Sequence, residues 1–216
     1  MIRVVMTRGY AGRQETKTGR QVQNRAKTVA PPVSGNNMKI MLHICCAVCA
    51  AGVAERLTAE GHDVRGLFYN PNIHPEEEYQ RRLEATSRVA RELDFPLKVA
   101  PYKPQEWLEA TASLASEPEG GKRCEVCFRI RLEETYRYLK EEGGDAFTTT
   151  LTVSPHKAAA VINQVGRQIG GDSFLARDFK KNRGFEQVIE RANEMELYRQ
   201  HYCGCRYSLR ESRHQH

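Results

Sequence analysis

The seven cysteines of this 216-residue chain fall into three short groups: Cys45, Cys46 and Cys49; Cys124 and Cys127; and Cys203 and Cys205. Thiolates bind soft metals and iron-sulfur clusters, and closely spaced thiols also cycle between dithiol and disulfide. A cysteine that only fills apolar space has no reason to recur in such pairs. The pattern therefore predicts metal or redox chemistry.

The spacing alone leaves several chemistries open. A structural zinc site would use Cys124, Cys127 and another pair, but the C-terminal pair lies about 75 residues away, whereas zinc knuckles are usually local. The adjacent side chains of Cys45 and Cys46 diverge, which suits two iron atoms of a cluster better than one tetrahedral ion. Cys46-x-x-Cys49 also fits a thioredoxin-like dithiol, and Cys203-x-Cys205 fits either a labile disulfide or a pair of metal ligands.

Alternating strands and helices must position these thiols. Apolar runs predict strands at 39–44, 64–68, 97–100, 147–153 and 174–175. Apolar residues at helical spacing fill the segments between and after them, with a helix start at Pro75 and another at Ser154-Pro155. We expect a single α/β domain whose mainly parallel, Rossmann-like sheet of about five strands resembles PP-loop and HUP proteins and has helices on both faces. The cysteines should gather at the carboxyl ends of its strands.

Charge divides the chain at residue 37. Residues 1–37 hold seven basic residues and one acidic residue and so carry the whole net charge of +6. That stretch lacks periodicity and ends in Pro31-Pro32 and Gly35-Asn36-Asn37, so we expect a disordered basic extension or a misassigned start before Met38. We assign 38–210 to the folded domain and 211–216 to a polar tail. Without a long apolar run or a signal-peptide core, we expect a cytoplasmic protein with no membrane partner.

Six segments together resemble one known family over residues 38–208, the QueH family of cobalamin-independent epoxyqueuosine reductases. They are His43-Ile-Cys45-Cys46-Ala-Val-Cys49, Tyr69-Asn-Pro-Asn-Ile-His-Pro75 with Glu78-Tyr79, Cys124-Glu-Val-Cys127-Phe-Arg129, Thr149-Thr-Leu-Thr-Val-Ser-Pro-His-Lys157, Asp178-Phe-Lys-Lys181, and Tyr198-Arg-Gln-His-Tyr-Cys-Gly-Cys-Arg-Tyr-Ser208. Val48 departs from the proline expected in the first motif, and that change removes no thiol.

The resemblance implies removal of the epoxide oxygen of epoxyqueuosine at the wobble position of tRNA. Two electrons and two protons are consumed, water is released, and the electron donor is not identified. It also implies a [4Fe-4S] cluster and a redox-active pair, with an additional iron as a further option. The matching cluster ligands are Cys45, Cys46, Cys124 and Cys127, and the matching redox pair is Cys203 and Cys205.

The remaining candidates follow from what this chemistry requires. A second iron would draw on Cys49 and Asp178, with Cys203 or Cys205 as further ligands, and would stabilise a developing alkoxide. His156 or Tyr69 would supply a proton, although His156 also fits a plain position in the first turn of a helix. A flipped base would need a stacking partner such as Tyr69 or Tyr202.

Basic residues near the cysteine motifs are candidates for tRNA contacts, because the folded part is neutral overall and needs a local patch. They are Lys122, Arg123, Arg129, Lys157, Lys180, Lys181 and Arg183. Two other classes stay open. A zinc-stabilised RNA-binding module would explain the thiols without catalysis. A nucleotide-binding PP-loop enzyme would explain the fold, although cysteines stand where its phosphate loop should be.

Overall fold

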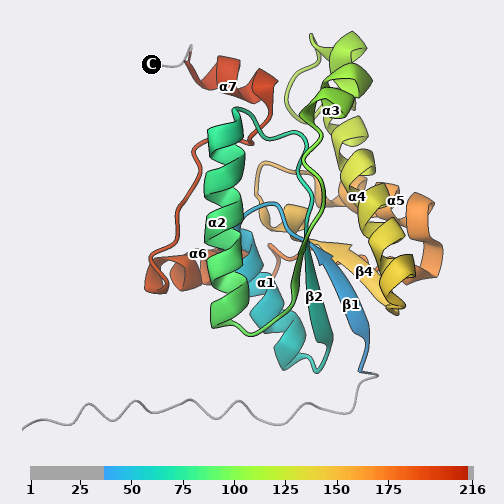
Figure 1. The fold of residues 1–216 in the computed structure, drawn as a ribbon, viewed down its shortest axis with the longest axis vertical. Helices are drawn as coiled ribbons and strands as arrows, with labels where there is room; N and C mark the ends of the chain where they lie inside the picture. The colour runs from blue at the N-terminus through green and yellow to red at the C-terminus, as the bar shows by residue number, and fades with distance from the viewer. Residues whose placement is uncertain (1–36, 214–216) are drawn as a thin grey trace, which may run out of the picture. The chain divides into compact units, whose positions relative to one another are not determined.

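Four parallel strands form the sheet at the centre of the protein, in the order β3-β2-β1-β4 (Figure 1). The structure, a computed structural model, describes residues 37–213, with side chains to residue 209. The strands are β1 (Lys39–His43), β2 (Asp63–Phe68), β3 (Leu97–Val99) and β4 (Ala146–Thr149). Because all four are parallel, their carboxyl ends share one edge of the sheet.

Helices cover both faces of the sheet. On one face α1 (Ala47–Ala59) packs between α2 (Glu76–Glu92) and α6 (Gly184–Glu194), and on the other α4 (Lys122–Glu142) packs beside α5 (Ala159–Gly170). Two shorter helices, α3 (Pro104–Thr111) and α7 (Arg206–Arg213), lie in the upper part of Figure 1, beyond the carboxyl ends of the strands. Three-residue turns of 3-10 helix follow α3 (Ala112–Leu114) and α5 (Gly171–Ser173).

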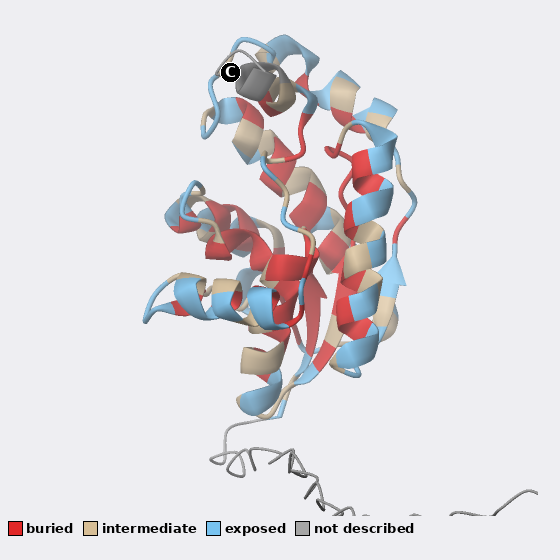
Figure 2. Cartoon of the chain, turned by 90° about the vertical axis from the view of Figure 1, so that its left-hand side faces the viewer, coloured by how far each residue is buried: buried red, intermediate tan, exposed pale blue. Residues whose placement is uncertain are grey.

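The alternation of side chains in β1 explains why the sheet needs both layers. Ile40 and Leu42 enter the core beneath α1, whereas Met41 enters the core formed with α4 and α5. All three are buried, and the strands and inner helix faces form the buried interior in Figure 2. A sheet covered on both faces in this way is typical of parallel α/β folds.

The predicted α/β fold is confirmed, but the sheet has four strands rather than five. Phe174 makes only an isolated bridge to Phe147. At the next residue the Thr148 hydroxyl, a side-chain group, donates to the carbonyl of Leu175. The fourth strand is also shorter than predicted. The Thr149 hydroxyl accepts from the Leu151 amide, and this bond turns the chain into a 3-10 turn at Thr150–Val153.

One predicted helix start shifts. The helix expected to open at Ser154-Pro155 begins at Ala159, so His156 lies in the preceding loop. At the C-terminus α7 spans Arg206–Arg213, and the domain end at residue 210 stays a prediction. The predicted basic extension, except for residue 37, lies outside the described residues, as does the tail beyond residue 213. Among residues 37–213 no helix has the length and apolar character needed to span a membrane.

Candidate metal and redox centre

The first cysteine group stands where β1 ends and α1 begins. The sulfur atoms of Cys45, Cys46 and Cys49 all lie within 4.8 Å of one another. Cys46 is the N-cap residue of α1, so the extended strand and the helix each fix part of this loop. Within the part of the chain that the structure describes, these three residues are the one group spaced to share a metal ion.

Thr150, from the neighbouring strand end, holds Cys45 in place. Its hydroxyl accepts from the Cys45 amide at 3.1 Å and donates to the Cys45 sulfur at 3.3 Å. Hydrogen bonds from the Cys46 and Cys49 thiols, with help from Thr150, hold the pKa of Cys45 well below its usual range. The hydrogen bond that Cys46 donates to Cys45 raises the pKa of Cys46 to about 12. Cys45 is therefore the thiol of this group that ionises first, as a metal ligand must.

The second group lies in the first turns of α4. The Gly120 amide donates to the Cys124 sulfur at 3.2 Å, and Cys127 is buried with Trp107 and Cys205 in a small apolar cluster. Burial raises the pKa of both Cys124 and Cys127. Cys127 is therefore held in apolar surroundings, whereas Cys124 is only partly buried.

The third group, Cys203 and Cys205, precedes α7, and both thiols are free. Cys205 donates to Cys203, and this bond, together with the charges of Lys157, Arg131 and Arg82, holds the pKa of Cys203 well below its usual range. The same bond raises the pKa of Cys205. Of the two thiols, Cys203 is therefore the nucleophilic one.

Two adjoining cavities bring the three groups to one place. A cavity of about 430 Å³ is lined by Cys45, Cys49 and Cys203. A smaller one of about 30 Å³ is lined by Cys203 and Cys205 together with Cys124 and Cys127. The larger volume is in the range of small-molecule sites, whereas the smaller holds little more than a water. Every cysteine except Cys46 thus faces one of the two cavities.

Two cations stand on the wall that the cavities share. Arg131 is 2% exposed, donates from Nε to the Cys127 carbonyl at 3.0 Å and leaves Nη2 buried without a partner. None of the ion pairs among the described residues includes it. Half-buried Lys157 also lines both cavities. A buried guanidinium needs a counter-charge, and the surrounding thiols supply one only when they are ionised, so the residues present fit a thiolate-held anionic group.

His43 is a site residue that sequence reasoning placed only inside a motif. Its ring is fully buried at the carboxyl end of β1, between the Thr149 hydroxyl at 2.9 Å and the Tyr69 carbonyl at 3.1 Å. Burial, with the charge of Arg131, lowers the pKa of His43 to about 4. The ring is therefore neutral at pH 7 and ties the ends of three strands together beneath the thiols.

The other sequence candidates separate into two sets. His156 is exposed and lines both cavities. Tyr69 instead packs into the apolar core with Phe128, where burial raises its pKa to about 12. Asp178 pairs with Lys180 at 3.3 Å and lines neither cavity. Of these three candidates, His156 therefore lines both cavities, whereas Tyr69 and Asp178 line neither.

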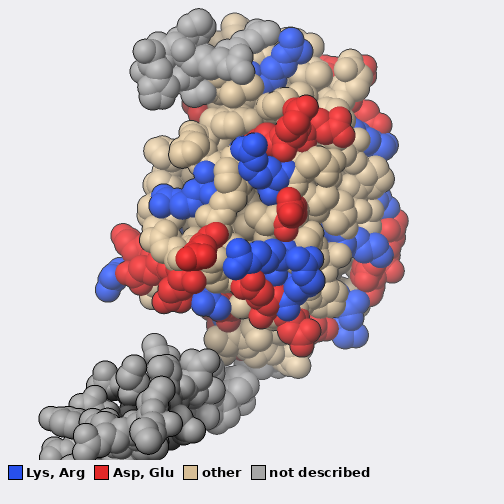
Figure 3. Space-filling view, turned by 60° about the vertical axis from the view of Figure 1, so that its left-hand side comes forward, with Lys and Arg blue, Asp and Glu red and all other residues tan. Residues whose placement is uncertain are grey.

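The basic candidates also differ in what their side chains do. Buried Arg123 donates to the carbonyls of residues 114, 115 and 117, and the Lys180 ammonium donates to those of 152 and 157. Lys122 and Arg129 line a surface hollow between α4 and α5, and Lys181 and Arg183 are exposed before α6. On the face drawn in Figure 3 basic and acidic side chains are interspersed, so the charge there has no single sign.

Residues 40–211 match the protein family described as epoxyqueuosine reductase QueH. The chain belongs to this family. The QueH protein of Streptococcus pyogenes serotype M1 is 39% identical over 180 residues, covering 79% of this chain and 70% of the relative. That of Staphylococcus epidermidis is 40% identical over 184 residues, covering 79% of this chain and 76% of the relative. The predicted QueH resemblance is thus confirmed, and with it the assignment to the oxidoreductases.

A solved structure supports the fold independently of the sequence. The U34-tRNA thiolase NcsA of Methanococcus maripaludis, described with its [4Fe-4S] cluster, aligns with a TM-score of 0.50 at 16% identity. The alignment covers 81% of this chain and 62% of the thiolase. At that identity the likeness concerns the fold alone, and it supports the parallel α/β sheet of this QueH member.

Proposed function

We propose that this chain reduces epoxyqueuosine to queuosine in tRNA, using a [4Fe-4S] cluster held by Cys45, Cys46, Cys124 and Cys127 and a redox pair formed by Cys203 and Cys205. The observation that carries the proposal is the meeting of three cysteine groups at two cavities around buried Arg131. Membership of the QueH family supplies the reaction, in which the epoxide oxygen leaves as water with two electrons and two protons.

The bound cluster would supply single electrons at a potential tuned by its surroundings. The positive charges of Arg131 and Lys157 compensate negative charge on the thiolates, and so they stabilise ionised cysteines at this site. Thr150 would stabilise the Cys45 thiolate by donating a hydrogen bond to its sulfur. Of the two proton-donor candidates, His156 is the one that lines the cavities, so it is the residue proposed to protonate the leaving oxygen.

The larger cavity is proposed to receive the modified base after it leaves the anticodon stack. Tyr202 lines this cavity and presents an aromatic ring for stacking. Lys122, Arg129, Lys181 and Arg183 are the basic candidates whose side chains stay at the surface, and we propose them for phosphate contacts. Arg123 and Lys180 are engaged by backbone carbonyls and make poorer candidates. Cys49 and Asp178 stay the proposed ligands of an additional iron, and Asp178 would have to exchange its ion pair with Lys180 for the metal.

Anaerobic purification with iron, sulfide and zinc analysis tests the cofactor, and nucleoside analysis of epoxyqueuosine-containing tRNA treated with the protein and dithionite tests the reaction. We expect a brown protein with iron and sulfide that converts the nucleoside to queuosine. A colourless protein that holds zinc and leaves epoxyqueuosine intact would contradict both parts and favour the zinc-stabilised RNA-binding module.

A further inference from the structure

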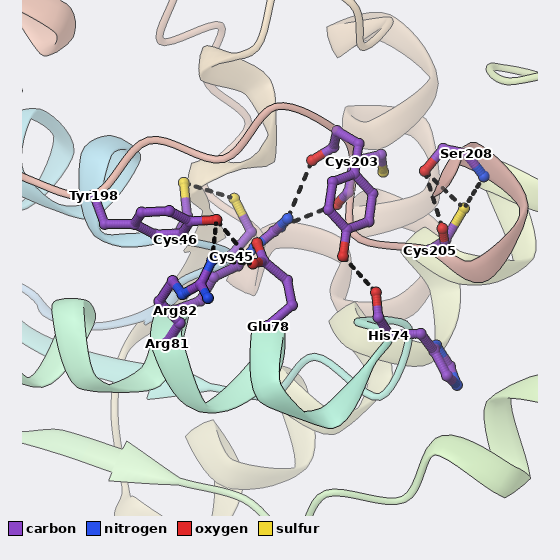
Figure 4. A network of polar contacts seen from close by, with 11 residues as sticks. Cys45, Cys46, His74, Glu78, Arg81, Arg82, Tyr198, Cys203, Cys205 and Ser208 are labelled. Carbon is purple, nitrogen blue, oxygen red and sulfur yellow. Dashed lines mark hydrogen bonds and ion pairs between the residues drawn. The ribbon is translucent and has the colours of Figure 1, made fainter. Parts of the chain in front are cut away.

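The segment between α6 and α7, residues 197–205, carries Cys203 and Cys205 and lies across the start of α2. We call it the cysteine strap. The Tyr198 hydroxyl donates to Glu78 at 2.8 Å (Figure 4). The His74 amide donates to the Gly204 carbonyl at 2.8 Å. The Tyr202 hydroxyl donates to the His74 carbonyl. The strap has no regular secondary structure, and side chains and backbone of residues 74–82 hold it in place instead.

Arg82 is the centre of these contacts. Its side chain is 3% exposed, and Nη1 and Nη2 donate to the carbonyls of Cys203 and Tyr202, each at 3.1 Å. Its Nε donates to Glu78 at 2.6 Å, one helical turn earlier on α2. The planar guanidinium thus donates hydrogen bonds to two consecutive carbonyls and one carboxylate. A lysine ammonium, which acts as a point charge, cannot reproduce this geometry.

Gly204 shows how closely the strap approaches this side chain. Its φ is +104°, in the region that favours glycine, and an added Cβ would lie 2.9 Å from Arg82 Nη1 and 3.1 Å from Ile73. The backbone therefore rests directly on the guanidinium, and the absence of a side chain between the two cysteines permits this contact.

The two carbonyls that Arg82 binds belong to the peptide groups on either side of the Cys203 α-carbon. Because peptide groups are planar, fixing both of them fixes φ and ψ of Cys203 and with them the direction of its Cα–Cβ bond. The side chain lines both cavities. Arg82, on a helix about 120 residues away in the sequence, therefore limits the Cys203 sulfur to the few positions that the side-chain rotamers allow.

We propose that Arg82 is a positioning residue for Cys203, and this rests on the proposed role of Cys203 and Cys205 as the redox pair. When the two thiols join, the new S–S bond releases two electrons and two protons, the number that removal of the epoxide oxygen as water consumes. A sulfur held in one direction meets its partners far more often than one on a loose loop. The contact acts on the reaction step, so its loss affects kcat rather than KM.

The test compares Arg82→Met and Arg82→Lys with Arg81→Met as the matched control on the same helix. Arg81 is exposed and contacts Tyr198 and Glu78 but neither of the two carbonyls. We expect Arg82→Met to lower kcat about tenfold or more, with KM, iron and sulfide unchanged. Arg82→Lys should fall between Arg82→Met and the unchanged protein, and Arg81→Met should match the unchanged protein.

A second readout needs no turnover. Alkylation of Cys203 by iodoacetamide is followed by peptide mass spectrometry on the holoprotein over a pH series, and the rate is extrapolated to the fully ionised thiolate, because loss of the Arg82 charge also raises the pKa of Cys203. This rate should be several-fold faster in Arg82→Met and unaltered in Arg81→Met, because the strap is released only in the former. Unaltered kcat and alkylation in Arg82→Met would overturn the proposal. If that variant does not fold, the same result in Arg82→Lys would do so.

The two readouts separate this inference from the function on which it rests. Faster alkylation in a protein that never converts epoxyqueuosine would contradict the proposed reaction and leave the positioning role standing. Unaltered alkylation and kcat in Arg82 variants of a protein that does convert it would contradict the positioning role alone.

Discussion

The cysteines after β1 and the cysteines of the strap are held in place in two different ways. Cys45 is fixed by its position just after β1 and by Thr150 in the turn that follows the adjacent strand β4, so the ends of the sheet build that group. Cys203 stands in a segment without regular structure and depends on Arg82 from a distant helix. Rigid backbone suits a group that keeps a cofactor, whereas a side-chain clamp leaves a segment that can be adjusted between redox states.

Cysteine substitutions should have the largest effects, and they test directly whether the two cysteine groups have different roles. Cys45→Ser, Cys46→Ser, Cys124→Ser and Cys127→Ser should each lower inorganic sulfide and iron, because a hydroxyl is a poor substitute for a thiolate ligand. Cys203→Ser and Cys205→Ser should keep most sulfide and abolish conversion of epoxyqueuosine in tRNA. Sulfide is the informative measurement, since an additional iron bound by the strap could be lost without touching the cluster.

Two outcomes would change the assignment. Equal loss of sulfide in Cys203→Ser and Cys124→Ser would make the strap a source of cluster ligands. Full activity in both strap variants would reject their redox role.

Arg131 lies where the two groups meet, and its removal should have the next largest effect. Arg131→Met deletes a buried positive charge beside the thiols, so we expect the midpoint potential of the bound cluster to become more negative in an anaerobic EPR titration. Arg123→Met is the comparison variant, because Arg123 is equally buried on α4, donates to three backbone carbonyls and acts by its charge on Cys124 alone among the thiols, whereas Arg131 acts on several. It should lower the melting temperature and shift the potential less than Arg131→Met does. A potential in Arg131→Met equal to that of the unchanged protein would show that Arg131 does not act on the cluster.

The same contrast explains what could be predicted from the sequence. The strands before Cys45 and Thr150 were predictable because apolar runs and flanking turn residues are local signals, and parallel strands place their ends together. Arg82 and Arg131 were not predictable as site residues. A Glu and an Arg four residues apart, such as Glu78 and Arg82, usually form a solvated helix pair, and only the distant strap buries this one.

The errors in the fold have equally local causes. The threonine-rich run 147–153 has strand propensity throughout, yet the Thr149 hydroxyl turns the chain after residue 149. Phe174 and Leu175 resemble a strand but supply one bridge only. Tyr69 was predicted as a proton donor or a stacking partner for the base, and its ring packs into the core cluster with Phe128 and lines neither cavity. Side-chain direction at a strand end depends on register, which a single sequence specifies poorly.

Thr150→Val tests the strand-end group with a smaller change. Valine keeps the shape of threonine but lacks the hydroxyl that accepts from the Cys45 amide and donates to the Cys45 sulfur. The substitution therefore leaves that amide without a partner. We expect a loss of about 1–3 kcal/mol in the free energy of unfolding and slower cluster assembly, measured by chemical denaturation and by the growth of cluster absorbance. Thr150→Ser keeps the hydroxyl and should be close to the unchanged protein. Equal behaviour of the two variants would show that the hydroxyl does not hold Cys45.

Removal of residues 1–37 should disturb neither cysteine group and is the smallest expected effect on the site. The sheet begins at Lys39, and Met38 already contributes its carbonyl to the Asp63 amide, so a chain that starts at Met38 keeps every described contact of β1. We expect soluble protein with unchanged iron and sulfide. Affinity for tRNA should weaken, because the removed segment carries the whole net charge of +6, and the difference should shrink as salt rises. Fluorescence anisotropy with labelled tRNA at two salt concentrations measures this, and insoluble protein after truncation would show that the segment belongs to the fold.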